Sequence, residues 1–418
     1  MPEDLAFREH IFEAWRRVSR RYGFLGYDGP PLEPLELYTE KSGDEIVGQL
    51  YNFRDKGDRE VAMRPEMTPS LARILGERSR SMPKPIRWFS TPQLFRYERQ
   101  QRGRLREHFQ WNVDLVGEAN VAADVEILAV ALDGLRELGL TAEDFRARVS
   151  DRRLLSALLR SAGVAEARLE QAFQVVDKVE REARDRSRER LEREVGLDRE
   201  GANRVLSLFD APGREALEAE FGEDAEVAPL LGELGEYMAS LEALGLGDFV
   251  EFDLTIVRGL AYYTGIVFEL FDRQGELRAI CGGGRYDRLL ERVGGEPLPA
   301  VGFGMGDVVL GELLQERKLR PEFARGVDLF IVTVGDDQRP LALKVARAQR
   351  ERGRSVLYGL RPQSVRKQFQ HAGNEGARAV LVLGPDEVGR GVGVLREMAG
   401  GEEREVSLES LMDGTETP

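Results

Sequence analysis

The sequence predicts an α+β protein in which an antiparallel sheet is interrupted by a helical insertion and followed by a separate α/β domain. Residues 86–98 and 108–117 alternate between apolar and polar side chains, as strands with one covered face do. Residues 151–240 are helical in composition, and residues 328–385 have the pattern of a βαβαβ unit, which favours a parallel sheet. A chain of 418 residues is long enough for two or three domains.

The first 150 residues contain both kinds of element. One apolar face runs through residues 5–22 and predicts a helix, which Gly23 and the prolines after it end. Two alternating stretches within residues 49–63 favour a hairpin, and Thr68-Pro69 is a typical start for a short helix over residues 67–75. A strongly amphipathic stretch predicts another helix over residues 122–140.

Changes in composition predict the domain boundaries. Residues 177–196 are almost entirely charged, and we interpret them as a solvated helix on the surface of the insertion. Strand-like sequence with many glycines follows over residues 249–306, and a helix is expected over 308–319. The predicted parts are a first half of one domain at 1–150, the insertion at 151–240, the second half at 241–320, and a separate domain at 326–418. Within the last domain we expect strands at 328–334, 355–360 and 377–384 and helices at 338–353 and 364–376.

Composition excludes several classes of protein. Hydrophobic residues make up 42% of the chain and no run of 18 apolar residues is present, so we expect a soluble protein without a membrane-spanning helix. The N-terminus lacks the apolar segment of a signal peptide, and a single cysteine, Cys281, excludes a disulfide framework, which favours a reducing cytoplasm. A net charge of −14 argues against a general DNA-coating protein but leaves a local basic surface open. Three widely spaced histidines argue against a histidine-rich metal site.

The densest candidate site lies between residues 95 and 117. Five arginines occupy the loop between two predicted strands: Arg96, Arg99, Arg102, Arg104 and Arg106. Arginine offers planar, bidentate donors for phosphates and carboxylates, and so many neighbouring charges repel one another unless an anion binds. Binding of a triphosphate or an RNA backbone is the functional interpretation, and a solvated basic turn is the alternative. Glu98, Gln110 and Asp114 flank the loop at even spacing, which keeps strand side chains on one face.

Two later stretches, residues 258–269 and 281–306, combine glycines with tyrosines. Glycine lets a backbone approach a ligand closely, and tyrosine adds an apolar body with a hydroxyl group. A tight turn packed by tyrosines is the alternative for the first stretch. The GFGMG segment lacks the spacing of a dinucleotide-binding fingerprint, and no histidine partner can be proposed that would make Cys281 a nucleophile.

Basic residues also concentrate in the last domain. Residues 339–367 contain nine of them against one acidic residue, Glu351: Arg339, Lys344, Arg347, Arg350, Arg352, Arg354, Arg361, Arg366 and Lys367. A solvated helix face explains part of this excess. Contact with RNA explains it better in a chain that is acidic overall.

In this order, the stretches resemble the motifs of the histidyl-tRNA synthetases, a family of class II aminoacyl-tRNA synthetases. Motif 2 has its counterpart in FRYERQQRGRLREHFQ, and the family's RPE-x-T segment in MRPEMT. The two histidine-specific peptides correspond to RGLAYYTGIVFE and CGGGRYDRLL, and the start of motif 3 to PAVGFGMG. The likeness covers essentially the whole chain. It implies a class II catalytic domain with an antiparallel sheet, a helical insertion and a C-terminal anticodon-binding domain.

The resemblance also implies roles for individual residues. It assigns Arg258 and Arg96 to catalysis, Arg96 by contact with the ATP α-phosphate and the substrate carboxylate. The expected histidine site comprises Glu66, Met67, Thr68, Arg96, Gln110, Asp114, Arg258, Tyr262, Tyr263 and Tyr286, with Asp114 and Tyr263 on either side of the imidazole. The expected loop for ATP and the tRNA acceptor end comprises Arg96, Glu98, Arg99, Arg104 and Arg106.

Two positions depart from the family pattern. Ala261 replaces the aspartate usual in the first histidine peptide, and Val309 stands where motif 3 usually carries an arginine that contacts ATP. The second departure raises an alternative, a synthetase-like regulatory subunit of ATP phosphoribosyltransferase in histidine biosynthesis. Such subunits usually lack the C-terminal domain, whereas about 90 residues follow the motifs here. A glycyl- or prolyl-type relative is a weaker alternative.

The function that the resemblance implies is a histidine–tRNA ligase. Its substrates would be L-histidine, ATP with Mg²⁺, and histidine tRNA. Class II enzymes are typically dimers, so a cytoplasmic homodimer without a membrane partner is expected.

Overall fold

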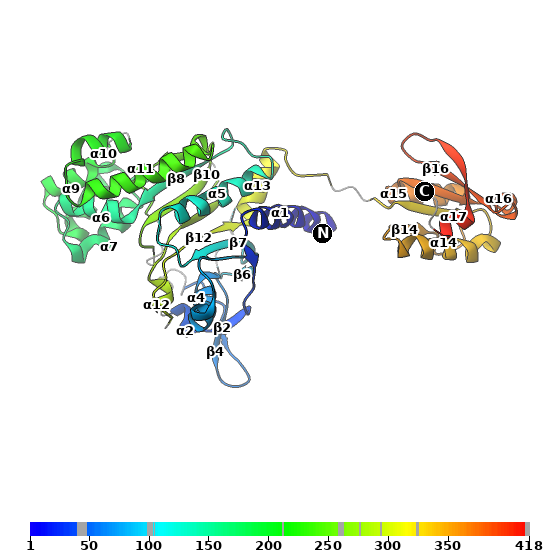
Figure 1. Ribbon diagram of the computed structural model, residues 1–418, viewed down its shortest axis with the longest axis horizontal. Helices are drawn as coiled ribbons and strands as arrows, with labels where there is room; N and C mark the ends of the chain where they lie inside the picture. Colours follow the sequence, from blue (N-terminus) through cyan, green and yellow to red (C-terminus); the bar gives the residue numbers. More distant parts are fainter. Residues whose placement is uncertain are drawn as a thin grey trace. The chain divides into compact units, whose positions relative to one another are not determined.

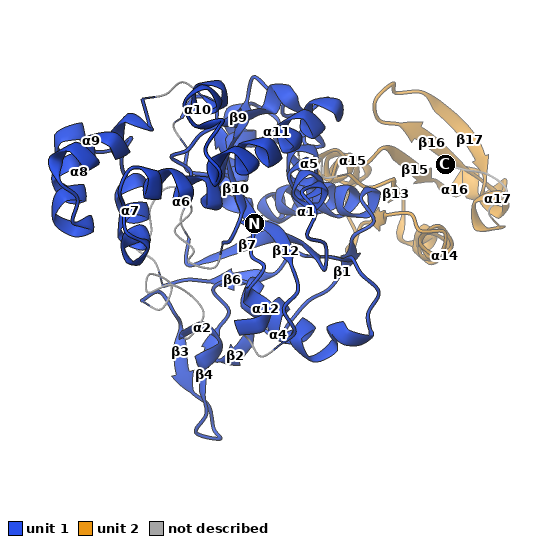
Figure 2. Ribbon diagram, turned by 60° about the vertical axis from the view of Figure 1, so that its left-hand side comes forward, with its two compact units in different colours: residues 1–321 blue, residues 322–418 orange. Residues whose placement is uncertain are grey.

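The computed structural model describes residues 1–39, 48–97, 103, 105–210, 213–257, 263–275, 277–292, 295–322 and 326–413. The chain divides into two compact units, Met1–Pro321 and Glu322–Pro418, which Figure 2 colours separately. Each unit encloses hydrophobic cores of its own. The α+β fold class predicted from the sequence is confirmed.

The first unit is built on a large, mainly antiparallel sheet (Figure 1). Its strand order is β1-β5-β7-β12-β11-β10-β8-β9, and β6 pairs with β7 beside this path. The strands are β1 (Leu25–Gly26), β5 (Ile86–Ser90), β6 (Gln93–Phe95), β7 (Glu107–Val116), β8 (Phe145–Asp151), β9 (Val250–Phe252), β10 (Ile266–Asp272), β11 (Cys281–Arg285) and β12 (Ala300–Gly306). The strand expected over residues 86–98 is therefore two strands. Pro92, which has no N–H for a ladder, lies in the break between them.

Three helices cover one face of this sheet or its end: α1 (Pro2–Arg21), α5 (Ala122–Arg136) and α13 (Asp307–Glu316). Trp111 of β7 stacks on Trp15 of α1 with 5.8 Å between ring centroids, and its indole N–H donates to Ser19 Oγ over 3.0 Å. A Cβ atom at Gly134 would overlap the Trp111 ring, which explains a glycine inside α5 despite its helix cost of about 1 kcal/mol. Alternation along β7 thus places its odd-numbered residues in the core.

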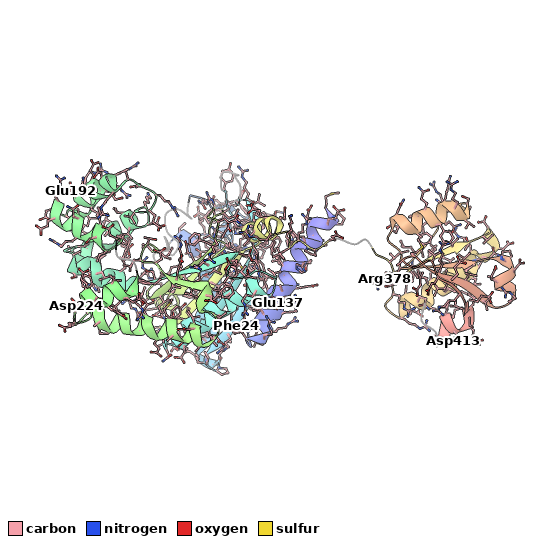
Figure 3. All side chains as sticks on the ribbon, turned by 90° about the horizontal axis from the view of Figure 1, so that it is seen from above. Phe24, Glu137, Glu192, Asp224, Arg378 and Asp413 are labelled. Atoms are coloured by element: carbon pink, nitrogen blue, oxygen red, sulfur yellow. The ribbon has the colours of Figure 1, made fainter. Side chains whose placement is uncertain are left out.

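An acidic residue just after α5 ties this helix to α1. Glu137 accepts from Arg17 Nε over 2.9 Å and forms an ion pair with Arg21 over 2.8 Å, and Figure 3 labels it beside the N-terminal helix. Both arginines are about half exposed, so each pair contributes less than about 1 kcal/mol. The buried aromatic contacts, not these ion pairs, hold α1 on the sheet.

The insertion lies between β8 and β9, which pair in parallel. Its helices are α6 (Arg152–Ser161), α7 (Leu169–Val176), α8 (Arg184–Arg190), α9 (Arg199–Ser207), α10 (Arg214–Phe221) and α11 (Val227–Ala243). The single solvated helix predicted over residues 177–196 is wrong. A turn precedes α8, and a π-helical turn, Leu191–Val195, follows it. Leu191 and Val195, four residues apart, lie on one face of this turn and are buried in the hydrophobic core.

A smaller three-stranded sheet, in the order β2-β4-β3, precedes β5 in the chain. The expected hairpin is confirmed as β3 (Asn52–Arg54) and β4 (Glu60–Met63), which come after β2 (Leu32–Pro34) and α2 (Glu36–Thr39). The helix α4 (Thr68–Arg78) comes after β4 and has Pro69 in its first turn, as the sequence predicted. A short helix, α12 (Leu289–Arg292), contacts α4 from the later part of the chain.

The second unit is a five-stranded sheet in the order β14-β13-β15-β16-β17. The predicted βαβαβ unit is confirmed as β13 (Leu329–Thr333), α14 (Arg339–Glu351), β14 (Val356–Tyr358), α15 (Val365–Asn374) and β15 (Ala379–Leu383), with parallel strands. The sequence did not predict the last four elements of this unit, which are α16 (Pro385–Gly389), an antiparallel pair, β16 (Val392–Glu397) and β17 (Glu403–Ser407), and α17 (Leu408–Asp413). One core lies among α14, α17 and the sheet, and a second lies under α15.

The search for a membrane span gives a negative result. Within the part of the chain that the structure describes, no helix combines the length and the apolar character that crossing a bilayer requires.

Candidate active site

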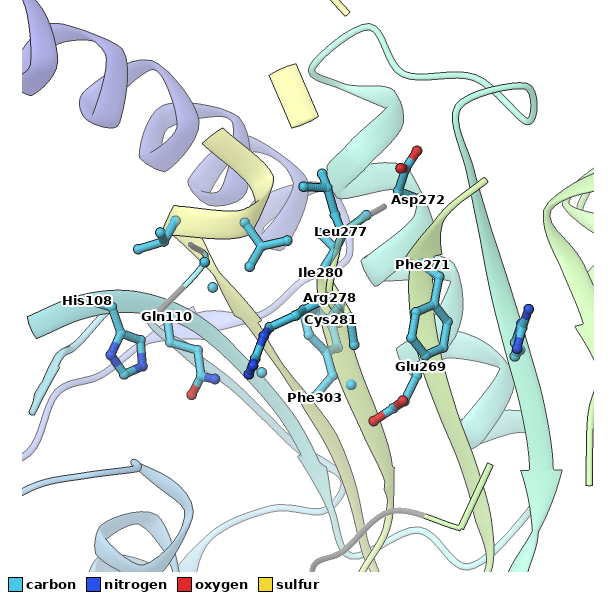
Figure 4. A pocket seen from close by; sticks show the side chains of 18 of the residues that line it. His108, Gln110, Glu269, Phe271, Asp272, Leu277, Arg278, Ile280, Cys281 and Phe303 are labelled. Atoms are coloured by element: carbon cyan, nitrogen blue, oxygen red, sulfur yellow. The ribbon is translucent and has the colours of Figure 1, made fainter. Parts of the chain in front are cut away.

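A cleft of about 1130 Å³ lies over the polar face of the large sheet, opposite α1 and α5 (Figure 4). Residues of β7, β10, β11 and β12 form its floor, and residues at the start of α4 and α13 contribute to its walls. The even-numbered residues of β7 face this cleft because side chains alternate along a strand. These are His108, Gln110, Asn112 and Asp114.

Glycines on the two central strands shape the floor. Across the sheet, Asn112 of β7 pairs with Gly304, which pairs with Gly282, which in turn pairs with Glu269. The neighbouring row runs from Asp114 to Gly302 in the same way. A Cβ atom at Gly302 would overlap the carboxylate of Asp114, and one at Gly304 would lie 2.7 Å from the amide of Gln110. The glycines therefore make room for polar side chains of β7 to lie across the floor.

Asp114 is a buried acid of the cleft. Its side chain is only 4% exposed, and the hydroxyl of Tyr286 donates a hydrogen bond to Oδ1. Burial raises the pKa of Asp114 to about 7, and the hydrogen bond from Tyr286 opposes this rise. A ligand that donates an N–H to this carboxyl would stabilise its ionised form. Tyr263, which is 7% exposed, lines the same end of the cleft.

Arg96 also lines the cleft, just after the end of β6. Its Nε donates to the carbonyl of Pro65 over 2.9 Å. Glu66 and Thr68 follow Pro65 in the chain and line the cleft beside it. The side chain of Met67 is fully buried instead, and a Cβ atom at Gly29 would lie 2.9 Å from its methyl group. Met67 therefore anchors the segment that presents Glu66 and Thr68.

His108 of β7 also lines the cleft. Burial, followed by the nearby charge of Arg96, lowers the pKa of the His108 imidazole to about 4, so this ring is neutral at pH 7. Arg106 does not line the cleft; its guanidinium lies over the ring of Tyr97, 4.5 Å from the centroid. The cleft thus combines a neutral imidazole, a guanidinium and a perturbed carboxyl.

Comparisons with known proteins assign the family. A family model described as histidyl-tRNA synthetase matches residues 1–306, and one described as an anticodon-binding domain matches residues 328–416. A histidine–tRNA ligase from Opitutus terrae is 44% identical over 413 residues, covering 98% of this chain and 94% of the relative. The chain belongs to the histidyl-tRNA synthetase family.

Solved structures of the family share the fold. Histidyl-tRNA synthetase from Nostoc sp. PCC 7120 matches with a TM-score of 0.81 and 24% identity, covering 99% of this chain and 96% of that one. A protein from Bacillus halodurans C, described as an ATP phosphoribosyltransferase regulatory subunit/histidyl-tRNA synthetase, matches with a TM-score of 0.75 and 24% identity, over 92% and 96% of the two chains. At these identities the likeness concerns the fold alone, so the fold does not separate the ligase from the regulatory subunit.

The structure brings together most of the described residues that the family motifs indicate. Those in the cleft are Glu66, Thr68, Arg96, Gln110, Asp114, Tyr263 and Tyr286. Met67 and Arg106 lie outside its lining. Five further residues, together with Ala261, lie outside the described part of the chain: Glu98, Arg99, Arg104, Arg258 and Tyr262.

Sequence reasoning missed several polar residues of the cleft, among them His108, Asn112, Glu269 and Arg278. Asn112 lies at even spacing between Gln110 and Asp114, so strand alternation could have identified it. Glu269 ends a stretch that the sequence singled out, and strand pairing places it in the same cross-strand row as Asn112, with Gly282 and Gly304 between them. No local signal distinguishes Arg278 from other surface arginines.

A metal site made by the protein alone is not evident. Among the residues with described positions, no group of three or more histidine, cysteine, aspartate or glutamate side chains could hold a metal ion.

Proposed function

We propose that the chain is a histidine–tRNA ligase, which activates L-histidine with ATP and transfers histidine to the 3′ end of histidine tRNA. Membership of the histidyl-tRNA synthetase family supports this proposal. The observation that carries it is the joint presence, in one cleft, of the perturbed carboxyl of Asp114 and the guanidinium of Arg96. The carboxyl of Asp114 can accept a hydrogen bond from an imidazole N–H, and the guanidinium of Arg96 can bind a phosphate or a carboxylate.

The proposed histidine pocket lies at the Asp114 end of the cleft. The imidazole would donate one N–H to Asp114, which Tyr286 holds in place. Tyr263 would contact the other side of the ring, and Glu66 and Thr68 would bind the α-amino group. Buried polar pairing of this kind discriminates by roughly 10⁴-fold or more against amino acids that cannot complete it.

The proposed first step needs no general base. The carboxylate of free histidine is ionised at pH 7, and one of its oxygens would attack the α-phosphorus of ATP while the bond to pyrophosphate breaks. Arg96, and Arg258 by resemblance, would neutralise charge at the α-phosphate. Mg²⁺ would supply further charge neutralisation on the phosphates. In the second step a hydroxyl of the tRNA 3′ end would attack the carbonyl carbon, and AMP would leave.

Three basic residues of the second unit support contact with the anticodon arm. Arg361 precedes α15, and Arg366 and Lys367 lie in its first turn; all three are exposed. Within the described chain, no carboxylate forms an ion pair with any of them. A helix N-terminus already favours an anion, so these charges suit RNA phosphates. By contrast, Arg350, Arg352 and Arg354 donate to atoms of their own unit, which reduces the RNA surface predicted from the sequence.

A regulatory subunit of ATP phosphoribosyltransferase remains the second candidate. The apolar side chain of Val309 in the cleft favours the regulatory subunit, because the arginine that usually contacts ATP at this position of the family is replaced by an uncharged residue. The match of residues 328–416 to an anticodon-binding domain favours the ligase. A homodimer and a cytoplasmic location are further predictions, for which the size of the purified protein in solution and fractionation of cells are the tests.

Histidine-dependent ATP–pyrophosphate exchange tests the proposal. We expect histidine, alone among the standard amino acids, to stimulate exchange by the purified chain. The physical reason is that only histidine completes the pairing with Asp114. Histidine binding without any exchange would favour the regulatory subunit.

A second expected result concerns Asp114→Asn. Asparagine keeps an acceptor for Tyr286 but loses the charge, so we expect kcat/KM for histidine at pH 8 to fall about 10- to 100-fold, the range of a hydrogen bond to a charged group. Because the pKa of Asp114 is about 7 in the free protein, histidine binding near pH 7 should release a proton from it. Calorimetry in buffers of different ionisation enthalpy measures this release, which should disappear in Asp114→Asn.

Asp58→Asn, in an exposed turn, is the matched control for Asp114→Asn.

The raised pKa of Asp114 also has a consequence for the stability of the protein. Burial favours the protonated form of Asp114, so its contribution to stability is present below about pH 4 and is lost as the pH rises through about 7. Unchanged proton release in Asp114→Asn would show that another group titrates on binding.

A further inference from the structure

Among the described residues, the start of α13 lines one wall of the cleft with apolar side chains, whereas binding of a triphosphate favours cations. Val308 and Val309, at the start of α13, line this wall, and Val309 is 8% exposed. A valine offers neither charge nor hydrogen-bond donor to the phosphates of ATP. If the chain uses ATP as proposed above, a cation from another element can supply positive charge at this wall.

Arg278 lies beside this wall although 31 positions separate it from Val309 in the sequence. Its segment is fixed on both sides. Leu277 is buried, the Ile280 N–H donates to the carbonyl of Leu270 over 2.8 Å, and the Ile280 carbonyl accepts from Gly306, just before α13. Figure 4 shows the Arg278 side chain extending from this segment toward Gln110.

Gly103 lies close to the side chains of both Val309 and Arg278. A Cβ atom there would lie 3.4 Å from Cγ2 of Val309 and 3.8 Å from Cδ of Arg278. The φ of Gly103 is +74°, in the left-handed region, and its N–H donates to Glu312 of α13 over 3.2 Å. Gly103, the start of α13 and Arg278 therefore meet at one place in the cleft.

The guanidinium of Arg278 is available for a ligand. It is exposed to the cleft, and among the described residues no carboxylate or carbonyl oxygen pairs with it. Arg273, which lines the same cleft, differs: it donates to the carbonyl of Ala142 over 2.9 Å and pairs with Glu143. A guanidinium without a described protein acceptor can pair with an anionic ligand, and its fork geometry fits phosphate oxygens.

We propose that Arg278 binds the β- and γ-phosphates of ATP and supplies the positive charge that Val309 does not. The proposal rests on the proposed ligase activity. It makes Arg278 a substrate-binding residue of the adenylation step, in addition to Arg96. The transferred part of ATP, the adenylate, would not depend on Arg278.

Exchange kinetics of Arg278→Ala, Arg278→Lys and Arg273→Ala test this assignment against the wild type. We expect Arg278→Ala to raise the KM for ATP about 10- to 100-fold, while the KM for histidine changes less than about twofold. Lysine keeps the charge, so Arg278→Lys should retain most of the affinity for ATP. Arg273→Ala should behave as the wild type. Inhibition by AMP, which lacks the β- and γ-phosphates, should be unchanged in Arg278→Ala.

Several results would overturn the inference. They are an unchanged KM for ATP in Arg278→Ala, an equal loss of affinity for ATP and AMP, a lysine variant as poor as the alanine variant, or a loss confined to tRNA in the charging reaction. Absence of exchange in the wild type would instead refute the proposed ligase activity. Unaltered tryptophan fluorescence of each variant shows that the fold is intact.

Discussion

Replacing Arg285 with methionine is expected to lower the free energy of unfolding of residues 1–321 by about 3–5 kcal/mol. Arg285 ends β11 and is 6% exposed. It donates from Nε to both carboxylate oxygens of Asp124 over 3.1 Å, and from Nη1 to the carbonyl of Glu118 over 3.1 Å and to Asp287 over 3.2 Å. Methionine leaves Asp124, which is 2% exposed, without this partner. An uncompensated buried charge causes the loss.

Urea unfolding followed by tryptophan fluorescence measures this loss. The three tryptophans, Trp15, Trp88 and Trp111, all lie in the first unit, so their fluorescence reports on that unit. Arg80→Ala is the control, because Arg80 is 80% exposed and forms a single ion pair with Glu296; we expect a loss below about 1 kcal/mol. Replacing Arg285 with methionine and Asp124 with leucine together should recover part of the stability, because no buried charge remains. A loss in the double variant equal to the sum of the two single losses would contradict this explanation.

Removal of residues 326–418 is expected to lower kcat/KM for tRNA in the charging reaction by at least about 100-fold and to leave histidine-dependent exchange largely intact. The residues proposed to carry adenylation lie before residue 310, and the first unit has its own core. Two lost hydrogen bonds to phosphates, at about 1.5 kcal/mol each, already account for roughly 100-fold. Exchange and charging are measured on the same truncated preparation.

The exposed residues Arg361, Arg366 and Lys367 refine this experiment in the full-length chain. Changing all three to alanine should weaken tRNA binding and lower the slope of log affinity against log salt by about two to three, since each phosphate contact contributes about 0.7 to 0.9. Arg390→Ala is the control, because Glu405 already pairs with Arg390 over 2.7 Å. Loss of exchange on truncation would show that the second unit supports the catalytic unit, and unchanged charging would refute the assignment to RNA binding.

Local patterns predicted the elements with long, regular periodicity. The helices α1, α5 and α14 and the strands β7, β13 and β15 have clear apolar faces, and all were predicted within a few residues of their ends. The prediction of one solvated helix over residues 177–196 was wrong because Leu191 and Val195 are buried, although most of the residues around them are charged. The pair β16 and β17 was missed because exposed polar residues such as Arg404 and Glu405 mask strand alternation.

The sequence by itself determined the motifs and therefore the family, because the order of arginine-, glycine- and tyrosine-rich stretches is a property of the chain before it folds. It also determined that Asp114 and Gln110 share one strand face, because alternation is a local property. Only the tertiary structure decided that Tyr286 reaches Asp114 across 172 positions, that Arg285 neutralises Asp124 across 161, and that Arg278 lies beside Val309. These contacts depend on which strands pair and in which register. That choice is made by burial of the whole sheet, and no single segment of the chain contains it.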